Sequence, residues 1–416
     1  MKKKLIFILT LVLVAAFFIS AFTKKDLPIN REEPSANIEF GATNLVADTP
    51  TVFMTTDISS NGLMAVYHAL GRKAEGKVAV KVHTGEPGGH HFLSPDLIKE
   101  LVQTVNGTIV ESNTAYGGRR ASTAMHKQVA IDHGFTAIAP VDILDEQGYI
   151  PLTVTKGNRI KQDFVGSHLT NYNFLIVLSH FKGHAMGGFG GAIKNMSIGI
   201  ASTAGKCWIH SSGNSMTSPW GGAQDPFLES MAEAASAVAG NFGDKIMYIS
   251  VMNNLSVDCD CSSNPAAPTM KDIGILASLD AVALDQACVD LVYAAPDGRD
   301  LIQRMQSRNG IHTVEHGAAI GFGSRTYKLR NVSLTSMEEK EVSTVYIYPN
   351  PANSAVHIPN HTNYDFISIF DMNGREVAKY KSESALSVQS IKQGMYVVQF
   401  KNKGKVIGVS TLLKKE

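Results

Sequence analysis

Residues 179–195 combine ionisable side chains with glycines in a mixture that packing alone does not explain. The segment directly follows an apolar run, residues 174–178, which predicts a buried strand. Its glycines let the backbone approach a ligand closely, and its imidazoles and amines can transfer protons, ligate a metal or capture an anion. The side chains that we expect to act in catalysis are those of His180, Lys182, His184 and Lys194.

The residues around this segment predict alternating strands and helices. Apolar runs predict strands at 77–83, 107–110, 174–179 and 246–251. Capping and turn residues predict helices at 95–105, 122–133, 225–240 and 280–293. Because alternating strands and helices form parallel sheets covered by helices, we predict an α/β core with a mostly parallel sheet over residues 51–325, as one domain or as two lobes.

Polar side chains gather where the predicted strands end. Ligands of such sheets bind beyond the carboxyl ends of the strands, so these side chains should lie near one another. The strand ends also deliver Glu111, Asp258 and Asp260. The residues that we expect to bind a small-molecule substrate are Lys81, His83, Glu86, Arg119, Arg120, Gly190, Gly191 and Asn195.

Two kinds of chemistry fit these residues. His180 and His184 with Cys259 and Cys261 could hold a transition metal, namely zinc, nickel or iron. Alternatively, the two histidines act as general base and general acid, while Lys182 and Lys194 hold a carboxylate or phosphate. The structural alternatives are a purely structural histidine pair, a tight glycine turn, and a solvated loop around Arg119 and Arg120.

The cysteines raise a separate question, because an exported protein meets an oxidising environment. Cys259 and Cys261 are too close in sequence to pair comfortably with each other, which leaves Cys207 and Cys288 as their possible partners. A structural disulfide to Cys207 therefore competes with a metal or redox role for residues 258–261. Cys288 lies on the apolar face of a predicted helix that begins after Asp280, the expected N-cap; Asp285 could face the site.

Both ends of the chain predict export rather than catalysis. Lysines 2–4 and the apolar residues 5–22 are typical of a signal peptide, which we place at 1–23, with an uncleaved anchor as the alternative. A linker follows at 24–50, and a second linker is expected at 326–342. After cleavage we expect no stable membrane span. The formal charge of +1, with 18% charged residues, gives no reason to expect nucleic acid as a partner.

Residues 343–416 predict a small antiparallel β-sandwich, with a hairpin at Asn373 and Gly374. This module resembles the C-terminal sorting domain of the bacterial type IX secretion system at 348–352, 369–374, 394–398 and 413–415. The resemblance implies recognition by that secretion machinery in a Bacteroidetes-type cell, and location at the cell surface or outside the cell. The alternative is an ordinary carbohydrate- or surface-binding module.

The core resembles the family called domain of unknown function 362, often described as uncharacterised iron–sulfur-centre proteins. The matching motifs lie at 81–87, 113–120, 133–135, 179–184, 188–195, 205–206, 259–261, 272–278 and 285–288. The resemblance implies an α/β fold but no established reaction. Many members carry a ferredoxin-like insert after the segment that matches residues 205–206. This chain lacks the insert and has four cysteines, which disfavours 4Fe-4S ferredoxin clusters. The layout is also distantly similar to that of nickel-pincer lactate racemases.

These observations predict an exported protein whose core acts on a small anionic substrate by metal-assisted or general acid/base catalysis. Two other functions remain open at this point. The core could be a non-catalytic cell-surface module that binds a metal or another ligand, or it could be a redox protein of the iron–sulfur type.

Overall fold

The computed structural model describes residues 49–332, 343–359, 361–371 and 374–416. The expected signal peptide, residues 1–23, lies outside these ranges, as do all but the last two residues of the expected linker 24–50. Within the described ranges, no helix combines the length and apolar character needed to cross a membrane.

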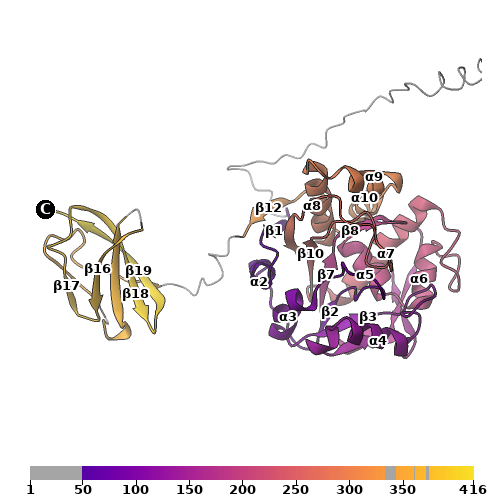
Figure 1. Cartoon of the computed structure of the whole chain (residues 1–416), viewed down its shortest axis with the longest axis horizontal. Helices are drawn as coiled ribbons and strands as arrows, with labels where there is room; N and C mark the ends of the chain where they lie inside the picture. The colour runs from indigo at the N-terminus through magenta and orange to yellow at the C-terminus, as the bar shows by residue number, and fades with distance from the viewer. Residues whose placement is uncertain (1–48, 333–342, 360, 372–373) are drawn as a thin grey trace, which may run out of the picture. The chain divides into compact units, whose positions relative to one another are not determined.

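One continuous eight-stranded sheet forms the centre of the core (Figure 1). Seven strands run in the same direction, and β11 is antiparallel to both of its neighbours, which confirms a mostly parallel α/β core. In spatial order the strands are β12 (Lys328–Asn331), β1 (Thr51–Thr55), β11 (Gly274–Ser278), β10 (Ile246–Met252), β7 (Phe174–His180), β2 (Val78–Lys81), β3 (Thr108–Glu111) and β4 (Val141–Ile143).

Helices cover both faces of the sheet, because the central strands are apolar on both sides. In β7, Leu175 and Val177 face one hydrophobic cluster, and Phe174, Ile176 and Leu178 face the other. The first cluster is closed by α5 (Ala192–Ile200), α7 (Gln224–Phe242), α8 (Ala281–Ala294), α9 (Arg299–Ser307) and α10 (His312–Ala319). The second is closed by α2 (Ser60–Ala69), α3 (Pro95–Thr104) and α4 (Thr123–Asp132).

The core sheet extends beyond the boundary expected from the sequence. Strand β12 lies within the segment 326–342, which we expected to be a linker, and pairs in parallel with β1. Its residues, Lys328–Asn331, are mostly exposed and have no apolar alternation, so pattern alone could not identify this edge strand. Strands β1 and β11, although buried, were not identified as strands either.

Residues 182–190 form a short hairpin that connects β7 to α5. Strands β8 (Lys182–His184) and β9 (Gly188–Gly190) pair antiparallel, and Gly191 precedes the first residue of α5. Two hairpin strands, β5 (Tyr149–Thr153) and β6 (Gln162–Gly166), and helix α6 (Thr203–His210) complete the core. Residues 179–195 thus extend from the end of the central strand β7, through the β8–β9 hairpin, to the start of α5.

The N-terminus of α5 is capped from a different helix. Asp285 of α8 accepts the backbone N–H groups of Ala192, at 2.7 Å, and Ile193, at 2.9 Å. A Cβ atom on Gly191 would lie 2.3 Å from Oδ1 of Asp285, so only glycine permits this approach. The expectation that Asp285 faces the site is therefore wrong: its buried carboxylate supports the helix. Asp280, in contrast, is the N-cap of α8 as expected, accepting the N–H of Ala283.

The C-terminal module confirms the predicted small sandwich. Strands β13 (Ser343–Thr344), β19 (Lys405–Lys414), β18 (Gly394–Asn402), β15 (Phe366–Asp371) and β16 (Glu376–Lys381) form a sheet that is antiparallel except for the β13–β19 pair. Strands β14 (Ala355–His357) and β17 (Ala385–Ser387) pair separately and share one hydrophobic cluster with that sheet. The expected hairpin joins β15 to β16, with Gly374 at a φ of 79°; Asn373 lies outside the described residues.

Substitution of Asp285 by alanine should lower the free energy of unfolding by about 2–4 kcal/mol, because two buried N–H groups lose their acceptor. Denaturant unfolding of the full chain, followed through the transition of the core, measures the effect. The matched control is Asp300→Ala, which removes an exposed acid from the first turn of α9 and should cost less than about 1 kcal/mol. Equal effects of the two substitutions would refute the capping role of Asp285.

Candidate functional site

With the exception of Arg119, the predicted site residues lie at or beyond the carboxyl ends of β2, β3, β7 and β10. These strands are parallel neighbours, so their ends meet along one edge of the sheet. The hairpin β8–β9, the start of α5 and the loop that follows β10 cover the same edge. Two groups of buried charges organise it.

The first group is centred on the carboxylate of Glu111, at the end of β3. Its Oε2 is 2.9 Å from the ammonium of Lys81, and its Oε1 is 3.1 Å from the guanidinium of Arg120. The backbone N–H of Thr84 also donates to it, at 2.9 Å. Burial alone would raise the pKa of Glu111, but the charges of Lys81 and Arg120 hold that pKa well below its usual value.

Glu86 extends this group of charges. Arg120 donates from Nε to the Glu86 carboxylate at 2.8 Å, and the hydroxyl of Tyr116 donates to the same oxygen at 2.9 Å. Lys81 also donates to the side-chain oxygen of Asn195, whose amide bridges β2 and β7 through three further hydrogen bonds. Four predicted substrate-binding residues, Lys81, Glu86, Arg120 and Asn195, thus have protein partners.

The second group is centred on Asp260, in the loop after β10. Its carboxylate is 2.8 Å from Nδ1 of His180 and 2.7 Å from the ammonium of Lys182. Burial alone would raise the pKa of this carboxyl, but His180 and Lys182 hold it far below its usual value. Nε2 of His180 contacts the carbonyl oxygen of Asn253 at 2.8 Å, and Lys182 also donates to the carbonyl oxygen of His91. Both ring nitrogens of His180 are therefore engaged.

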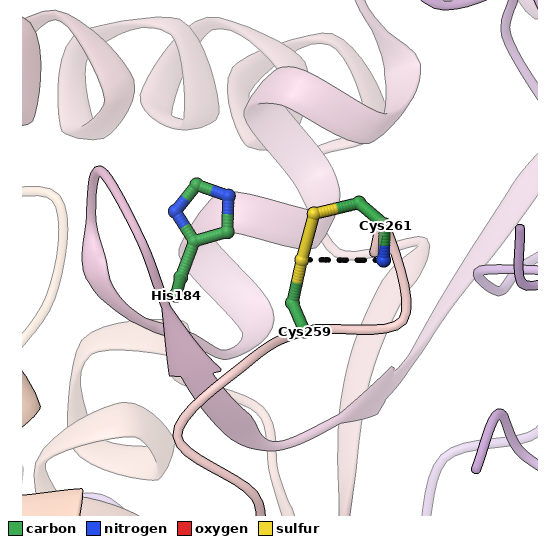
Figure 2. A group of neighbouring side chains, drawn as sticks. All are labelled: His184, Cys259 and Cys261. Atoms are coloured by element: carbon green, nitrogen blue, oxygen red, sulfur yellow. Dashed lines mark hydrogen bonds between the residues drawn. A yellow bond between two sulfur atoms is a disulfide. The ribbon is translucent and has the colours of Figure 1, made fainter. Parts of the chain in front are cut away.

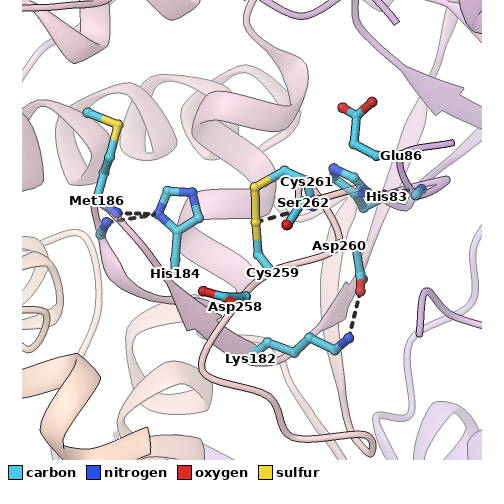
Figure 3. Close-up of a disulfide and its surroundings, with 12 residues drawn as sticks. His83, Glu86, Lys182, His184, Met186, Asp258, Cys259, Asp260, Cys261 and Ser262 are labelled. Atoms are coloured by element: carbon cyan, nitrogen blue, oxygen red, sulfur yellow. Dashed lines mark hydrogen bonds and ion pairs between the residues drawn. A yellow bond between two sulfur atoms is a disulfide. The ribbon is translucent and has the colours of Figure 1, made fainter. Parts of the chain in front are cut away.

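His83 and His184 have a different arrangement, in which only one ring nitrogen is engaged. Nδ1 of His83 accepts the backbone N–H of Gly85 at 3.0 Å. Nδ1 of His184 accepts the N–H of Gly187 at 2.8 Å and that of Met186 at 3.2 Å (Figure 3). Because Nδ1 accepts, the neutral ring carries its proton on Nε2. Burial, together with neighbouring positive charges, lowers the pKa of both imidazoles well below its usual value, so both stay neutral.

Lys194 contributes an unpaired positive charge to this edge. It lies in the first turn of α5, and its ammonium makes no hydrogen bond or ion pair to any residue that the structure describes. Its side chain passes close to Gly190, where an added Cβ would lie 3.3 Å from Cδ of the lysine. Burial, then the charges of Lys81 and Arg120, lower the pKa of Lys194 from 10.5 to about 8.

Arg119 does not reach this edge. It pairs with Asp132 at 3.0 Å on the surface, where both side chains are more than 40% exposed. Its neighbour Arg120 is buried, so the two consecutive arginines have different environments. Arg119 therefore has the environment of a solvated loop, whereas Arg120 already pairs with Glu86 and Glu111.

The expected disulfide pairing is wrong. Cys259 and Cys261 are bonded to each other, with their Cα atoms 5.2 Å apart, whereas Cys207 and Cys288 are free and buried (Figure 2). The sequence argument held that cysteines so close in sequence do not pair comfortably. The residue between them, Asp260, is held by His180 and Lys182, and the Cα–Cα distance lies within the usual range for a disulfide.

His184, Cys259 and Cys261 form the one predicted metal-ligand group that the described part of the chain brings together, with one ligand atom of each within 4.8 Å of the others. These three side chains do not present a metal site in this state. The two sulfurs are in a disulfide rather than thiolates, and Nε2 of His184 carries a proton. The fourth predicted ligand, His180, has no free ring nitrogen.

Sequence analysis missed the two carboxylates that organise this edge. Glu111 and Asp260 were recognised as strand-end residues, but nothing in the spacing indicated which cations they would pair with. The sequence signal for Glu111 was its position directly after a predicted buried strand, and that for Asp260 was its position between two cysteines. Two cavities of about 320 and 170 Å³ have linings that contain none of the predicted site residues.

Replacing Glu111 by glutamine should lower the free energy of unfolding by about 3–5 kcal/mol, because Lys81 and Arg120 lose their shared counter-charge. The folded-state pKa of Glu111 is depressed, so its stabilisation is present above about pH 4.5 and is lost as the pH falls through the folded value. The variant should lack that component of acid sensitivity in denaturant titrations at several pH values. Glu146→Gln, at an exposed ion pair with Lys127, is the control and should cost less than about 1 kcal/mol.

Protein isolated with its disulfide intact should hold no stoichiometric transition metal. The disulfide supplies no thiolate ligand, and Nε2 of His184 carries a proton. Elemental analysis of protein purified without chelators tests this expectation. A stoichiometric metal in the unreduced parent that disappears in a His184→Ala variant would contradict it.

Comparisons with known proteins identify two regions of the chain. Residues 78–290 match a family described as domain of unknown function (DUF362), and residues 346–414 match a secretion system C-terminal sorting domain. No curated protein matches the chain. The sorting domain marks the protein for export to the cell surface or the exterior by type IX secretion.

Solved structures resemble the core only distantly. The lactate racemase apoprotein from Thermoanaerobacterium thermosaccharolyticum is 18% identical, with a TM-score of 0.32 over 51% of this chain and 53% of that one. A Thermotoga maritima protein from a structural genomics project is 12% identical, with a TM-score of 0.31 over 50% of this chain and 53% of that one. The chain thus spans about half the length of each. Since the family match covers more than half of its residues, the chain belongs to the DUF362 family.

Proposed function

We propose that the exported core binds a small anionic substrate and transfers a proton on it, with Lys194 as the base and His83 and His184 as hydrogen-bond donors. One observation carries the proposal. Among the described residues, the ammonium of Lys194 and Nε2 of His83 and of His184 have no hydrogen-bond or ion-pair partner, whereas Lys81, Arg120, His180 and Lys182 pair with Glu111 or Asp260.

Lys194 suits the role of a base because its pKa is lowered to about 8. A general base works best when its pKa lies near the operating pH, since an appreciable fraction is then unprotonated. In its protonated form the same group attracts an anionic substrate. An ordinary exposed lysine, with a pKa near 10.4, would supply little free amine at that pH.

His83 and His184 suit the role of donors rather than bases. Each carries its proton on Nε2, because its Nδ1 accepts backbone N–H groups. Neutral imidazoles fixed in this way can stabilise the negative charge that develops on a substrate oxygen when a neighbouring carbon loses a proton. The proposal therefore revises the general base and general acid roles that the sequence suggested for His180 and His184.

Non-catalytic anion binding is the principal alternative, because the same three donors could hold a ligand without turnover. A metal-assisted reaction would first need reduction of Cys259 and Cys261, since the oxidised pair lacks thiolates. Lys194→Arg separates catalysis from binding: arginine keeps the positive charge but stays protonated at any accessible pH.

Proton exchange should be detectable by NMR in deuterated buffer, using small carboxylates with a proton on a carbon next to a carbonyl group. We expect loss of that proton signal at a rate that rises with pH, because the base must be unprotonated, and levels off above about pH 8. Lys194→Arg should lower the rate at least about 100-fold while retaining substrate binding in calorimetry. Unchanged exchange in this variant would refute the role of Lys194, and binding without exchange in the parent would favour the non-catalytic alternative.

A further inference from the structure

We propose that Cys259 and Cys261 form a redox-active pair that exchanges its disulfide with external thiols, and that His184 stabilises the thiolate released. This activity is independent of the proton transfer on an anionic substrate. The proposal rests on three features of the disulfide: the short loop that it closes, the contacts that hold this loop, and the groups that surround its sulfurs. Each of these differs from what a structural disulfide requires.

The disulfide contributes little to holding the fold together. The stabilisation from a disulfide grows with the length of chain that it closes, and this one encloses a single residue. Its loop is held by other contacts: Glu86 donates its N–H to the carbonyl oxygen of Asp260 at 3.0 Å, and Arg304 donates to the Asp258 carboxylate at 3.1 Å. Breaking the sulfur–sulfur bond leaves these contacts in place.

Asp260 keeps the two cysteines together in either redox state. Its side chain points away from the sulfurs and is clamped by His180 and Lys182 (Figure 3). The Cα atoms on either side, 5.2 Å apart, are therefore fixed at a separation typical of disulfides. A reduced pair held in this way can close again without a rearrangement of the backbone.

The surroundings of the pair stabilise a thiolate. The N–H of Cys261 donates to Sγ of Cys259 at 3.2 Å, and Nε2 of His184 lies on the side of the ring that faces both sulfurs (Figure 2). The nearby negative charge of Asp258 is offset by Arg304. Both cysteines are half-buried, whereas Cys207 and Cys288 are buried, and burial raises the pKa of each of those two thiols. Reactive cysteines are distinguished by such partly exposed, thiolate-stabilising positions.

The exchange balances with an aliphatic thiol as the reductant. A thiolate of the external compound attacks Sγ of Cys261, the bond between the two protein sulfurs breaks, and Cys259 leaves as a thiolate that accepts hydrogen bonds from the Cys261 N–H and from His184. A second external thiolate then attacks the mixed disulfide at the external sulfur and releases Cys261. Two electrons pass to the protein pair, and the two external thiols are joined as a disulfide.

The test equilibrates the full chain either in glutathione redox buffers or with a reduced unfolded polypeptide. Each sample is then quenched in acid, alkylated and analysed by mass spectrometry. We expect reversible titration of the 259–261 pair while Cys207 and Cys288 stay unlabelled in the folded protein. Exchange with glutathione assigns a small thiol as the partner, and exchange with the polypeptide alone assigns a protein thiol; either result supports the proposal. A pair that becomes reducible only when the protein unfolds would overturn it.

The role of His184 is tested separately through the pH dependence of alkylation of the reduced protein. His184→Phe removes the donor, so the thiolate fraction at pH 7 should fall about tenfold, which corresponds to a shift of one pH unit in the alkylation profile. His184→Gln offers an amide N–H and should restore most of that loss. The same profile in the parent and in His184→Phe would show that His184 does not act on the thiolate.

Discussion

Two buried carboxylates, those of Glu111 and Asp260, organise the edge of the sheet at the carboxyl ends of β2, β3, β7 and β10. Each neutralises two buried basic side chains, and a charge left without a counter-charge costs far more in a protein interior than at a surface. Glu111 ties the ends of β2 and β3 to the segment that carries Arg120. Asp260 ties the end of β7 and strand β8 to the loop after β10.

The remaining chemistry follows from what these two carboxylates leave unpaired. Lys194, on α5, is close enough to Lys81 and Arg120 to be affected by their charges, but no carboxylate in the described part of the chain pairs with it. His83 and His184 satisfy Nδ1 with backbone N–H groups of their own loops. The result is a set of hydrogen-bond donors without an acceptor among the residues that the structure describes, which is the arrangement that an anion requires.

The sequence predicts the frame of the fold well because its signals are local. Apolar runs identified β2, β3, β7 and β10, and Asp280 identified the start of α8. The edge strand β12 has no such pattern, since only β1 gives it a place in the sheet. The candidate site residues were chosen by type and position, but the contacts that they make depend on partners far away in sequence. His180 and His184 look equivalent in the chain, yet one is engaged at both nitrogens and the other at one.

The disulfide and the proposed proton-transfer site share His184, so the redox state of the cysteines affects proton transfer although thiol exchange does not require it. In the oxidised state, which export to an oxidising environment favours, the sulfurs carry no charge and Nε2–H is available to a substrate oxyanion. In the reduced state a thiolate competes for the same N–H group. Its negative charge also favours the protonated form of nearby Lys194, because an opposite charge raises the pKa of an amine. The oxidised protein is therefore the form in which the lysine is best suited to act as a base.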